Sequence, residues 1–245
     1  MWWRMGKFFF KPEEREGQHV KIIGNTAHHM LNVLRIRIGQ ELTLCDGQCV
    51  DYFARLESIA LKPAAVVFEL LSSSPCKTEP VVPITLYQGM PKGDKMEWII
   101  EKCIEAGISK IVPVLTARTV VKISSATQKG ERYNRIAESA AAQSMRGIVP
   151  IISPPVSFLE ALASIHKGLL LVAYEKEQCR TIKSALENIA PTPVSLWVGP
   201  EGGFEESEIQ TLAEKGVLPI SLGHRVLRTE TAGLVALSQI NCIWE

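Results

Sequence analysis

The sequence predicts an α/β protein made of a small, mostly β N-terminal part and a larger, mainly parallel sheet with helices on both faces. Short β-prone runs separated by turns fill residues 1–72. From residue 81 onward, strand-like and helix-like segments alternate, which is typical of parallel strands joined by crossover helices. Two strand-like runs, Val194–Val198 and Val217–Leu222, lead into glycine loops. Such loops at the carboxyl edge of a parallel sheet indicate a ligand crevice.

The N-terminal part is predicted to be a small β-barrel over residues 1–72. Its strand-like runs are Phe8–Phe10, Val20–Ile23, Glu41–Cys45, Val50–Leu56 and Ala65–Leu71. Asp46-Gly47, between two of these runs, is a hairpin signal. One helix is expected over Thr26–Leu34, with Thr26 as its N-cap.

Residues 73–80 are polar, contain two prolines and break every periodic pattern, so they are predicted to be a linker. The second domain is then expected over residues 81–245. Its expected strands are Ile84–Gln88, Lys110–Leu115, Leu169–Tyr174, Val194–Val198 and Leu218–Leu222. Its expected helices follow Asp94, cover Arg132–Met145, follow a capping box of Ser157 with Glu160, cover residues 180–189 and 207–215, and run from Glu230 to Trp244.

Composition places the chain among ordinary soluble proteins, with 46% hydrophobic and 22% charged residues. No apolar run approaches the roughly 20 residues of a membrane span, so we expect a cytoplasmic protein. The six cysteines form no C-x-x-C pair, which favours reduced thiols over a metal site or a disulfide framework. The net charge of +1 argues weakly against a nucleic-acid binder, although residues 1–37 hold seven Lys and Arg against three Glu.

The loop Gly199-Pro200-Glu201-Gly202-Gly203 follows a predicted buried strand directly. It is neither a P-loop nor a G-x-G-x-x-G turn, so the two commonest phosphate-binding motifs are excluded. Glycine lets a ligand approach the backbone closely, and the amides of such a loop suit the polar edge of an adenine and a ribose. Leu222 and Leu227 suit the face of a ring.

Taken together, the loop at 199–203, Leu222-Gly223 and Leu227-Arg228-Thr229-Glu230-Thr231-Ala232 resemble the SPOUT methyltransferases, a family with a trefoil-knotted site for S-adenosyl-L-methionine (AdoMet). The resemblance covers nearly the whole chain. Residues 29–35 are similar to the family's PUA-like N-terminal barrel, and residues 92–107 to its first catalytic-domain helix. Gln143-Ser144 resembles its glutamine-serine motif, although Ala142 precedes it where a glutamate is expected, and Gly6-Lys7 stands where an arginine is usual.

The resemblance implies an AdoMet-dependent enzyme that methylates N3 of a uridine in small-subunit (16S) ribosomal RNA, free or within the 30S subunit, and acts as a homodimer. The residues expected to hold AdoMet are Val198, Gly199, Pro200, Glu201, Gly202, Gly203, Leu222, Gly223, Leu227, Arg228, Thr229, Thr231 and Ala232. The expected catalytic residues are Arg228, Glu201 and Glu230, the expected RNA phosphate contacts are Lys7, Arg35, Arg118 and Arg146, and no metal is expected.

Two other functions fit the sequence. One is a SPOUT methyltransferase that acts on another RNA, such as tRNA. The other is a non-enzymatic RNA-binding assembly factor with the same fold. Uridine N3 carries a proton that must leave before methyl transfer, so the site needs a base or a group that stabilises the uracil anion. Arg228 is expected either to stabilise the developing negative charge or to hold the target phosphate. Glu201 and Glu230 are both candidates to accept the proton or to orient Arg228.

Overall fold

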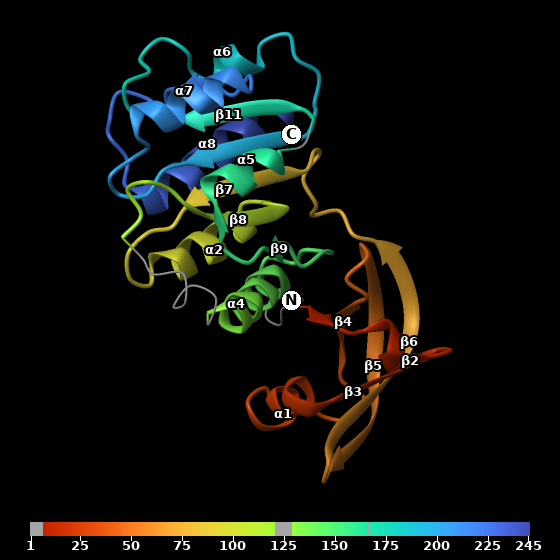
Figure 1. Ribbon diagram of the computed structural model, residues 1–245. Coiled ribbons are helices and arrows are strands. Elements are labelled where there is room, and N and C mark those ends of the chain that lie inside the picture. The colour runs from red at the N-terminus through yellow and green to blue at the C-terminus, as the bar shows by residue number, and fades with distance from the viewer. Residues whose placement is uncertain (1–6, 121–128, 166) are drawn as a thin grey trace. The chain divides into compact units, whose positions relative to one another are not determined.

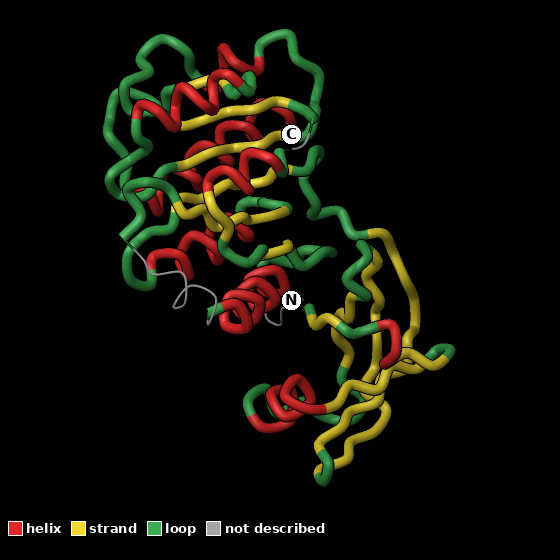
Figure 2. The backbone as a smooth tube through the Cα atoms, in the orientation of Figure 1, coloured by secondary structure: helices red, strands yellow, loops and turns green. Residues whose placement is uncertain are grey.

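The structure is a computed structural model that describes residues 7–120, 129–165 and 167–245. The chain divides into two compact units. The N-terminal unit comprises Met1–Glu79 and Ala141–Val149, and the C-terminal unit comprises Pro80–Ala140 and Pro150–Glu245. Figures 1 and 2 show the helices and strands of each unit.

The N-terminal unit is a six-stranded sheet with one α-helix packed against it. Its elements are β1 (Phe8–Phe9), η1 (Pro12–Glu14), β2 (Arg15–Glu16), β3 (His19–Ile23), α1 (Gly24–Asn32), β4 (Glu41–Cys45), β5 (Val50–Leu61) and β6 (Ala64–Pro75). The strand order is β1-β4-β5-β6-β3-β2, with β1 parallel to β4 and every other pair antiparallel. This arrangement agrees with the predicted mostly β domain.

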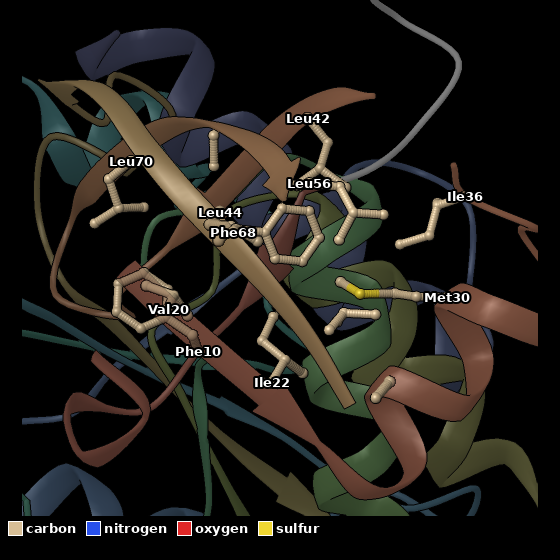
Figure 3. Packing of buried hydrophobic residues seen from close by; sticks show 13 residues of the cluster. Phe10, Val20, Ile22, Met30, Ile36, Leu42, Leu44, Leu56, Phe68 and Leu70 are labelled. Carbon is tan, nitrogen blue, oxygen red and sulfur yellow. The ribbon is translucent and has the colours of Figure 1, made fainter. Parts of the chain in front are cut away.

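One apolar cluster fills this unit. Alternate residues of the strands, such as Val20 and Ile22, point into it, as the period of two in a half-buried strand requires. Met30 of α1 joins them and is fully buried. Figure 3 shows Met30, Leu56 and Phe68 pointing toward one another. The helix therefore packs on the sheet through Ala27 and Met30, whereas Val33 and Leu34, which follow it, are exposed.

Two strands of this unit are longer than the sequence indicated. Strands β5 and β6 have 12 residues each, and Ser72–Pro75 of β6 pairs with Val50–Phe53 of β5. The first residues of the expected linker therefore belong to a ladder. Ladder hydrogen bonds use the backbone, so exposed serines continue the strand without any apolar signal. Helix α1 begins at Gly24, and Thr26, which we expected as its N-cap, lies inside it.

The C-terminal unit carries a parallel sheet in the order β10-β8-β7-β12-β11-β13, and β9 also pairs with β8. Its strands are β7 (Ile84–Gly89), β8 (Lys110–Leu115), β9 (Ile151–Ile152), β10 (Val156–Ser157), β11 (Leu169–Ala173), β12 (Val194–Val198) and β13 (Leu218–Ile220). Its helices are α2 (Lys95–Glu105), α4 (Gly130–Gln143), α5 (Phe158–Ala163), α6 (Ile182–Leu186), α7 (Glu206–Glu214) and α8 (Thr229–Trp244). The prediction of a mainly parallel sheet is confirmed.

Pro113 lies in β8, an interior strand, although proline has no N–H for a ladder and is usually confined to edge strands or bends. On the side away from β7, the neighbouring strands pair with β8 only at residues 110–111 and 114–115. Pro113 sits in the gap between them, where no ladder hydrogen bond is lost.

Helices cover both faces of this sheet, and adjacent residues of a strand are therefore buried on opposite faces. Tyr87 stacks on Trp197, with ring centroids 4.5 Å apart, in a cluster that includes residues of α5 and α7. Leu86, on the other face, lies against Gly233 of α8. In Figure 1, α5 lies in front of the sheet and α8 behind it. No described helix is long and apolar enough to span a membrane.

The strand order changes direction between β7 and β12. From β7 the chain proceeds to β8 on one side, while β11 and β13 lie on the other side of β12. Loops that leave the carboxyl ends of β7 and β12 therefore diverge and open a crevice, which is where open α/β sheets bind their ligands. The glycine loop after Val198 starts at this point.

Candidate active site

A cleft of about 800 Å³ opens at the carboxyl edge of the sheet. It is lined by the residues after β11, β12 and β13, by the first residues of α8, and by Lys95 at the start of α2. Every residue expected to hold the cofactor lines this cleft, except Thr231. The volume falls within the range of about 300–1,000 Å³ that small-molecule sites occupy.

The glycine loop of this cleft is held by very close backbone packing. A Cβ on Gly89, at the end of β7, would lie 2.5 Å from Cδ and 2.6 Å from N of Pro200. A Cβ on Gly199 would lie 3.0 Å from Cα of Gly203. Gly203 donates its N–H to Pro200 O and has a φ of +68°, a left-handed conformation that favours glycine. The loop thus needs glycine at both of its ends and at its neighbour on β7.

A buried hydrogen-bond network joins this loop to β7 and α8. Thr229 Oγ1 donates to Gly199 O at 2.6 Å, and Gln88 Nε2 donates to Thr229 Oγ1 at 3.0 Å. Gln88 Nε2 also contacts Gly89 O at 3.0 Å. Gln88 is fully buried and Thr229 is 7% exposed, so water does not weaken these bonds. The network fixes the start of α8 relative to the glycine loop.

Two glutamates of the cleft share one lysine. Lys95 Nζ lies 2.9 Å from Glu201 Oε1 and 3.5 Å from Glu230 Oε2. Burial raises the pKa of Glu201, but Lys95 and the amides of Glu201 and Lys92 outweigh it, and the pKa is lowered. The hydrogen bond to Glu201, together with the charges of Glu201 and Glu230, raises the pKa of Lys95. Both carboxylates therefore face a permanent positive charge near neutral pH.

Glu230 and Arg228 differ from Glu201 in how they are engaged. Within the described residues, Glu230 Oε2 is buried and has no hydrogen-bond partner, because its contact with Lys95 is an ion pair without hydrogen-bond geometry. Arg228 is the N-cap residue of α8, its side chain is 84% exposed, and its Nη1 lies 3.9 Å from Glu230 Oε1. A largely buried carboxylate and an exposed guanidinium thus lie together in the cleft.

Two of the four residues expected to contact RNA phosphates are instead buried in the N-terminal unit. Lys7 is 1% exposed, and its Nζ lies 2.6 Å from Asp51 Oδ1. Arg146 is 2% exposed and pairs with Glu79, whose carboxylate also accepts the N–H of Gly147. Burial raises the pKa of Glu79, but Arg146 and the backbone amides outweigh it and lower the pKa. Both cations neutralise internal carboxylates and are not exposed to bind RNA, which corrects the expectation.

The other two expected RNA contacts are exposed. Arg35 follows α1 in a left-handed turn with a φ of +52°. Arg118 lies beside the glycine loop, and its Nη1 donates to Gly202 O at 2.6 Å. A Cβ on Gly202 would touch this arginine side chain, so Gly202 leaves room for Arg118.

Sequence reasoning missed three parts of the cleft. Gln88 was assigned only to a strand, although a fully buried amide beside Gly89 is an unusual strand end. Lys95 was noted only as part of a family motif. Four residues that follow β11 also line the cleft: Tyr174, Glu175, Glu177 and Gln178. Neighbouring parallel strands end at the same edge of a sheet. If the strand order had been known, the position of β11 beside β12 would have identified these residues.

The described residues contain no group of three or more His, Cys, Asp or Glu side chains that could hold a metal ion. The six cysteines are all free. The site is lined by glycine-loop backbone, by apolar side chains, by the carboxylates of Glu175, Glu177, Glu201 and Glu230, and by the cationic side chains of Lys95, Arg225 and Arg228.

Two family models match the chain. Residues 77–241 match an RNA methyltransferase domain, and residues 22–69 match an RNA methyltransferase PUA domain. Among solved structures, a ribosomal RNA small subunit methyltransferase E from Neisseria gonorrhoeae bound to S-adenosyl methionine has a TM-score of 0.86 and 33% identity, with 98% of each chain covered. A putative methyltransferase from Legionella pneumophila with bound cofactor SAM has a TM-score of 0.88 and 30% identity, again with 98% of each chain covered.

Curated relatives give the same result along the full length. The ribosomal RNA small subunit methyltransferase E of Bacillus subtilis is 35% identical over 240 residues, covering 94% of this chain and 93% of the relative. The protein of the same name from Synechocystis is 33% identical over 237 residues, covering 96% and 76%. The motifs that line the cleft, the matched domains and these relatives agree, and the chain belongs to the ribosomal RNA small subunit methyltransferase E family.

Proposed function

We propose that this protein transfers the methyl group of AdoMet to N3 of a uridine in small-subunit ribosomal RNA. The observation that carries the proposal is that three separate stretches of the cofactor motif, at 198–204, 220–223 and 227–230, line one cleft beside Arg228. AdoMet is the methyl donor named in the bound structures of two relatives. The family supports an rRNA methyltransferase, and the choice of uridine N3 rests on the sequence resemblance and on the acid–base groups at the mouth of the cleft.

The residues of the cleft fit the parts of AdoMet. Val198, Leu222 and Leu227 offer apolar surface for the adenine ring, and the backbone of the glycine loop offers polar groups for its edge. The carboxylates of Glu201 and Glu230 favour a cationic group in the same cleft. When bound, AdoMet supplies an electrophilic methyl group, and the protein supplies position and electrostatics.

The side chains at the mouth of the cleft divide the remaining work. Glu201 is held by Lys95 and by the N–H of Lys92, so it anchors the glycine loop to the start of α2. Glu230 Oε2 is buried beside Lys95, and its Oε1 lies 3.9 Å from the exposed Arg228, so we assign to Oε1 the proton of uridine N3. Arg228 is exposed beside it and is assigned to the negative charge that develops on the uracil oxygens.

We further propose that the N-terminal unit selects the RNA and that the C-terminal unit holds AdoMet. The matched PUA domain and the exposed Arg35 support the first part, and the position of the whole cleft within the C-terminal unit supports the second. A two-fold homodimer, a trefoil knot and action in the cytoplasm belong to the same proposal, through the family resemblance. The partly exposed outer side of α8, with Leu234, Val235 and Ile243, would serve as a dimer surface.

Mass spectrometry of nucleosides tests this function. The full chain is incubated with AdoMet that carries a deuterated methyl group and with small-subunit ribosomal RNA, assembled small subunits or tRNA, all lacking the modification. We expect deuterated 3-methyluridine at a single position of the small-subunit RNA and none in tRNA. Label in tRNA alone would favour another RNA substrate, label on another atom would exclude N3, and RNA binding without label would favour an assembly factor.

A further inference from the structure

We propose that Lys95 is a positioning residue for methyl transfer, whose ammonium pairs with both Glu201 and Glu230 and so holds Glu230 in place to accept the uridine proton. This inference rests on the proposed function, because it assigns a partner to the proton acceptor of that reaction. The proposal does not require Lys95 to contact AdoMet or the RNA.

The geometry of Lys95 links three elements of the site. The residue begins α2, Glu201 belongs to the loop after β12, and Glu230 lies in the first turn of α8. Its Nζ donates a hydrogen bond to Glu201 at 2.9 Å and makes only an ion pair with Glu230 at 3.5 Å. Glu201 therefore has a hydrogen bond to Lys95, whereas Glu230 Oε2 is buried with only an ion pair. The other oxygen of Glu230, Oε1, lies 3.9 Å from Arg228 and is the one left to accept a proton.

Helix stability does not explain a lysine at this position. The first turn of a helix carries partial positive charge from its backbone dipole, so a cation there is unfavourable, typically by about 0.3–1 kcal/mol. Lys102, near the other end of α2, lies where the dipole favours a cation. An unfavourable local placement is expected where function requires the charge.

Other charged groups near Lys95 cannot replace it. On its own helix, Asp94 pairs with Lys129 and Glu97 pairs with Arg132. From α8, Arg228 lies 3.9 Å from Glu230, but its side chain is 84% exposed and its charge is screened by water. Among the described residues, Lys95 is thus the cation shared by the two carboxylates.

Removal of Lys95 has a defined consequence for proton transfer. Two carboxylates that lose a shared cation repel each other, and this repulsion raises the pKa of the pair. The pair then binds a proton at a higher pH than in the native enzyme, which leaves less of the enzyme able to accept the proton of uridine N3. Activity should therefore be lost mainly at low pH and recovered as the pH rises above the new pKa. A merely structural role would lower activity by the same factor at every pH.

The reaction itself balances through Glu230. A bond forms between uridine N3 and the methyl carbon while the bond from that carbon to sulfur breaks, with its electron pair remaining on sulfur. The proton leaves N3 for the Glu230 carboxylate and passes from there to solvent. The ammonium of Lys95 keeps its own protons throughout, since both neighbouring carboxylates stabilise its charged form.

The test compares Lys95→Met with Lys95→Arg and with Lys102→Met. Lys102 is a matched control, because it lies on the same helix, pairs with two glutamates and is outside the cleft. Single-turnover methylation of small-subunit RNA is measured from pH 5.5 to 9, together with AdoMet affinity. For Lys95→Met we expect roughly a 100-fold loss at low pH, a loss below about 10-fold at pH 9, and an acidic limb shifted upward by about one pH unit or more.

Lys95→Arg should restore most of the activity, and Lys102→Met should match the native enzyme. A double variant, Lys95→Met with Glu201→Gln, removes the repelling charge and should move the acidic limb back toward the native position. The inference is overturned if Lys95→Met loses activity equally at all pH values, or if the double variant does not shift the limb. A native enzyme that transfers no methyl to this RNA would instead refute the proposed function, and the inference with it.

Discussion

Replacing Gly89 with alanine should weaken AdoMet binding by roughly 30-fold, although the added methyl group never touches the ligand. The new Cβ would lie within 2.6 Å of two Pro200 atoms, N and Cδ, and neither belongs to a flexible side chain. The loop at 199–203 must therefore move away from β7. Overpacking of this kind lowers the stability of the fold by about 1–3 kcal/mol. We expect the displaced loop to lose contacts with AdoMet worth about 2 kcal/mol of binding free energy, which corresponds to the roughly 30-fold weaker affinity.

Titration calorimetry measures the AdoMet affinity of the full chain, and thermal unfolding of the full chain measures the loss of stability. Gly130→Ala is the matched control, because a Cβ there meets nothing within 4 Å and its φ is not positive. We expect the control to bind AdoMet as the native protein does. Native affinity in Gly89→Ala would show that the loop is not held by this contact.

Replacing Arg228 with alanine should lower the rate of methyl transfer by roughly 100- to 1,000-fold, the usual loss when a single group that stabilises developing charge is removed. AdoMet affinity should change by less than about threefold, because the side chain is 84% exposed and its one ion contact, to Glu230, is long. The loss should therefore appear in the rate of the chemical step.

Single-turnover rates at saturating AdoMet and RNA separate the chemical step from binding. Arg228→Lys should recover part of the rate, since it keeps the charge but not the planar guanidinium. Arg135→Ala, an equal loss of charge on the exposed side of α4, should be neutral. If Arg228→Ala lowers AdoMet affinity by the same factor as the rate, Arg228 holds the cofactor and does not act on the uracil.

The sheet of the C-terminal unit was largely predictable from sequence. Strands β8 and β12 have the predicted bounds, and the predicted capping box of Ser157 and Glu160 is present. These signals are local: apolar runs, alternation with helices, and capping pairs three residues apart. Asp94, after which a helix was expected, is the N-cap residue of α2, but its side chain makes no capping bond and pairs with Lys129 instead.

The packing between distant segments was not predictable in this way. Arg146 and Glu79 are 67 positions apart, and nothing near either residue indicates the pair. The sequence therefore suggested an exposed arginine where the structure has a buried one. Likewise, Gly89 is informative only once Pro200 is known to lie against it. The ion pairs of Lys95 were equally hidden in the sequence, because its two partner glutamates follow it by more than 100 residues.

The central claim, that the cleft at the carboxyl edge of the sheet is an AdoMet site, is tested most directly by titrating AdoMet into chelator-treated protein in a calorimeter. The described residues include no metal-ligand cluster, and we expect binding to persist after chelation. We expect one site per chain with a dissociation constant in the micromolar range, which corresponds to a binding free energy on the order of −8 kcal/mol. The absence of any binding heat at millimolar AdoMet would contradict it.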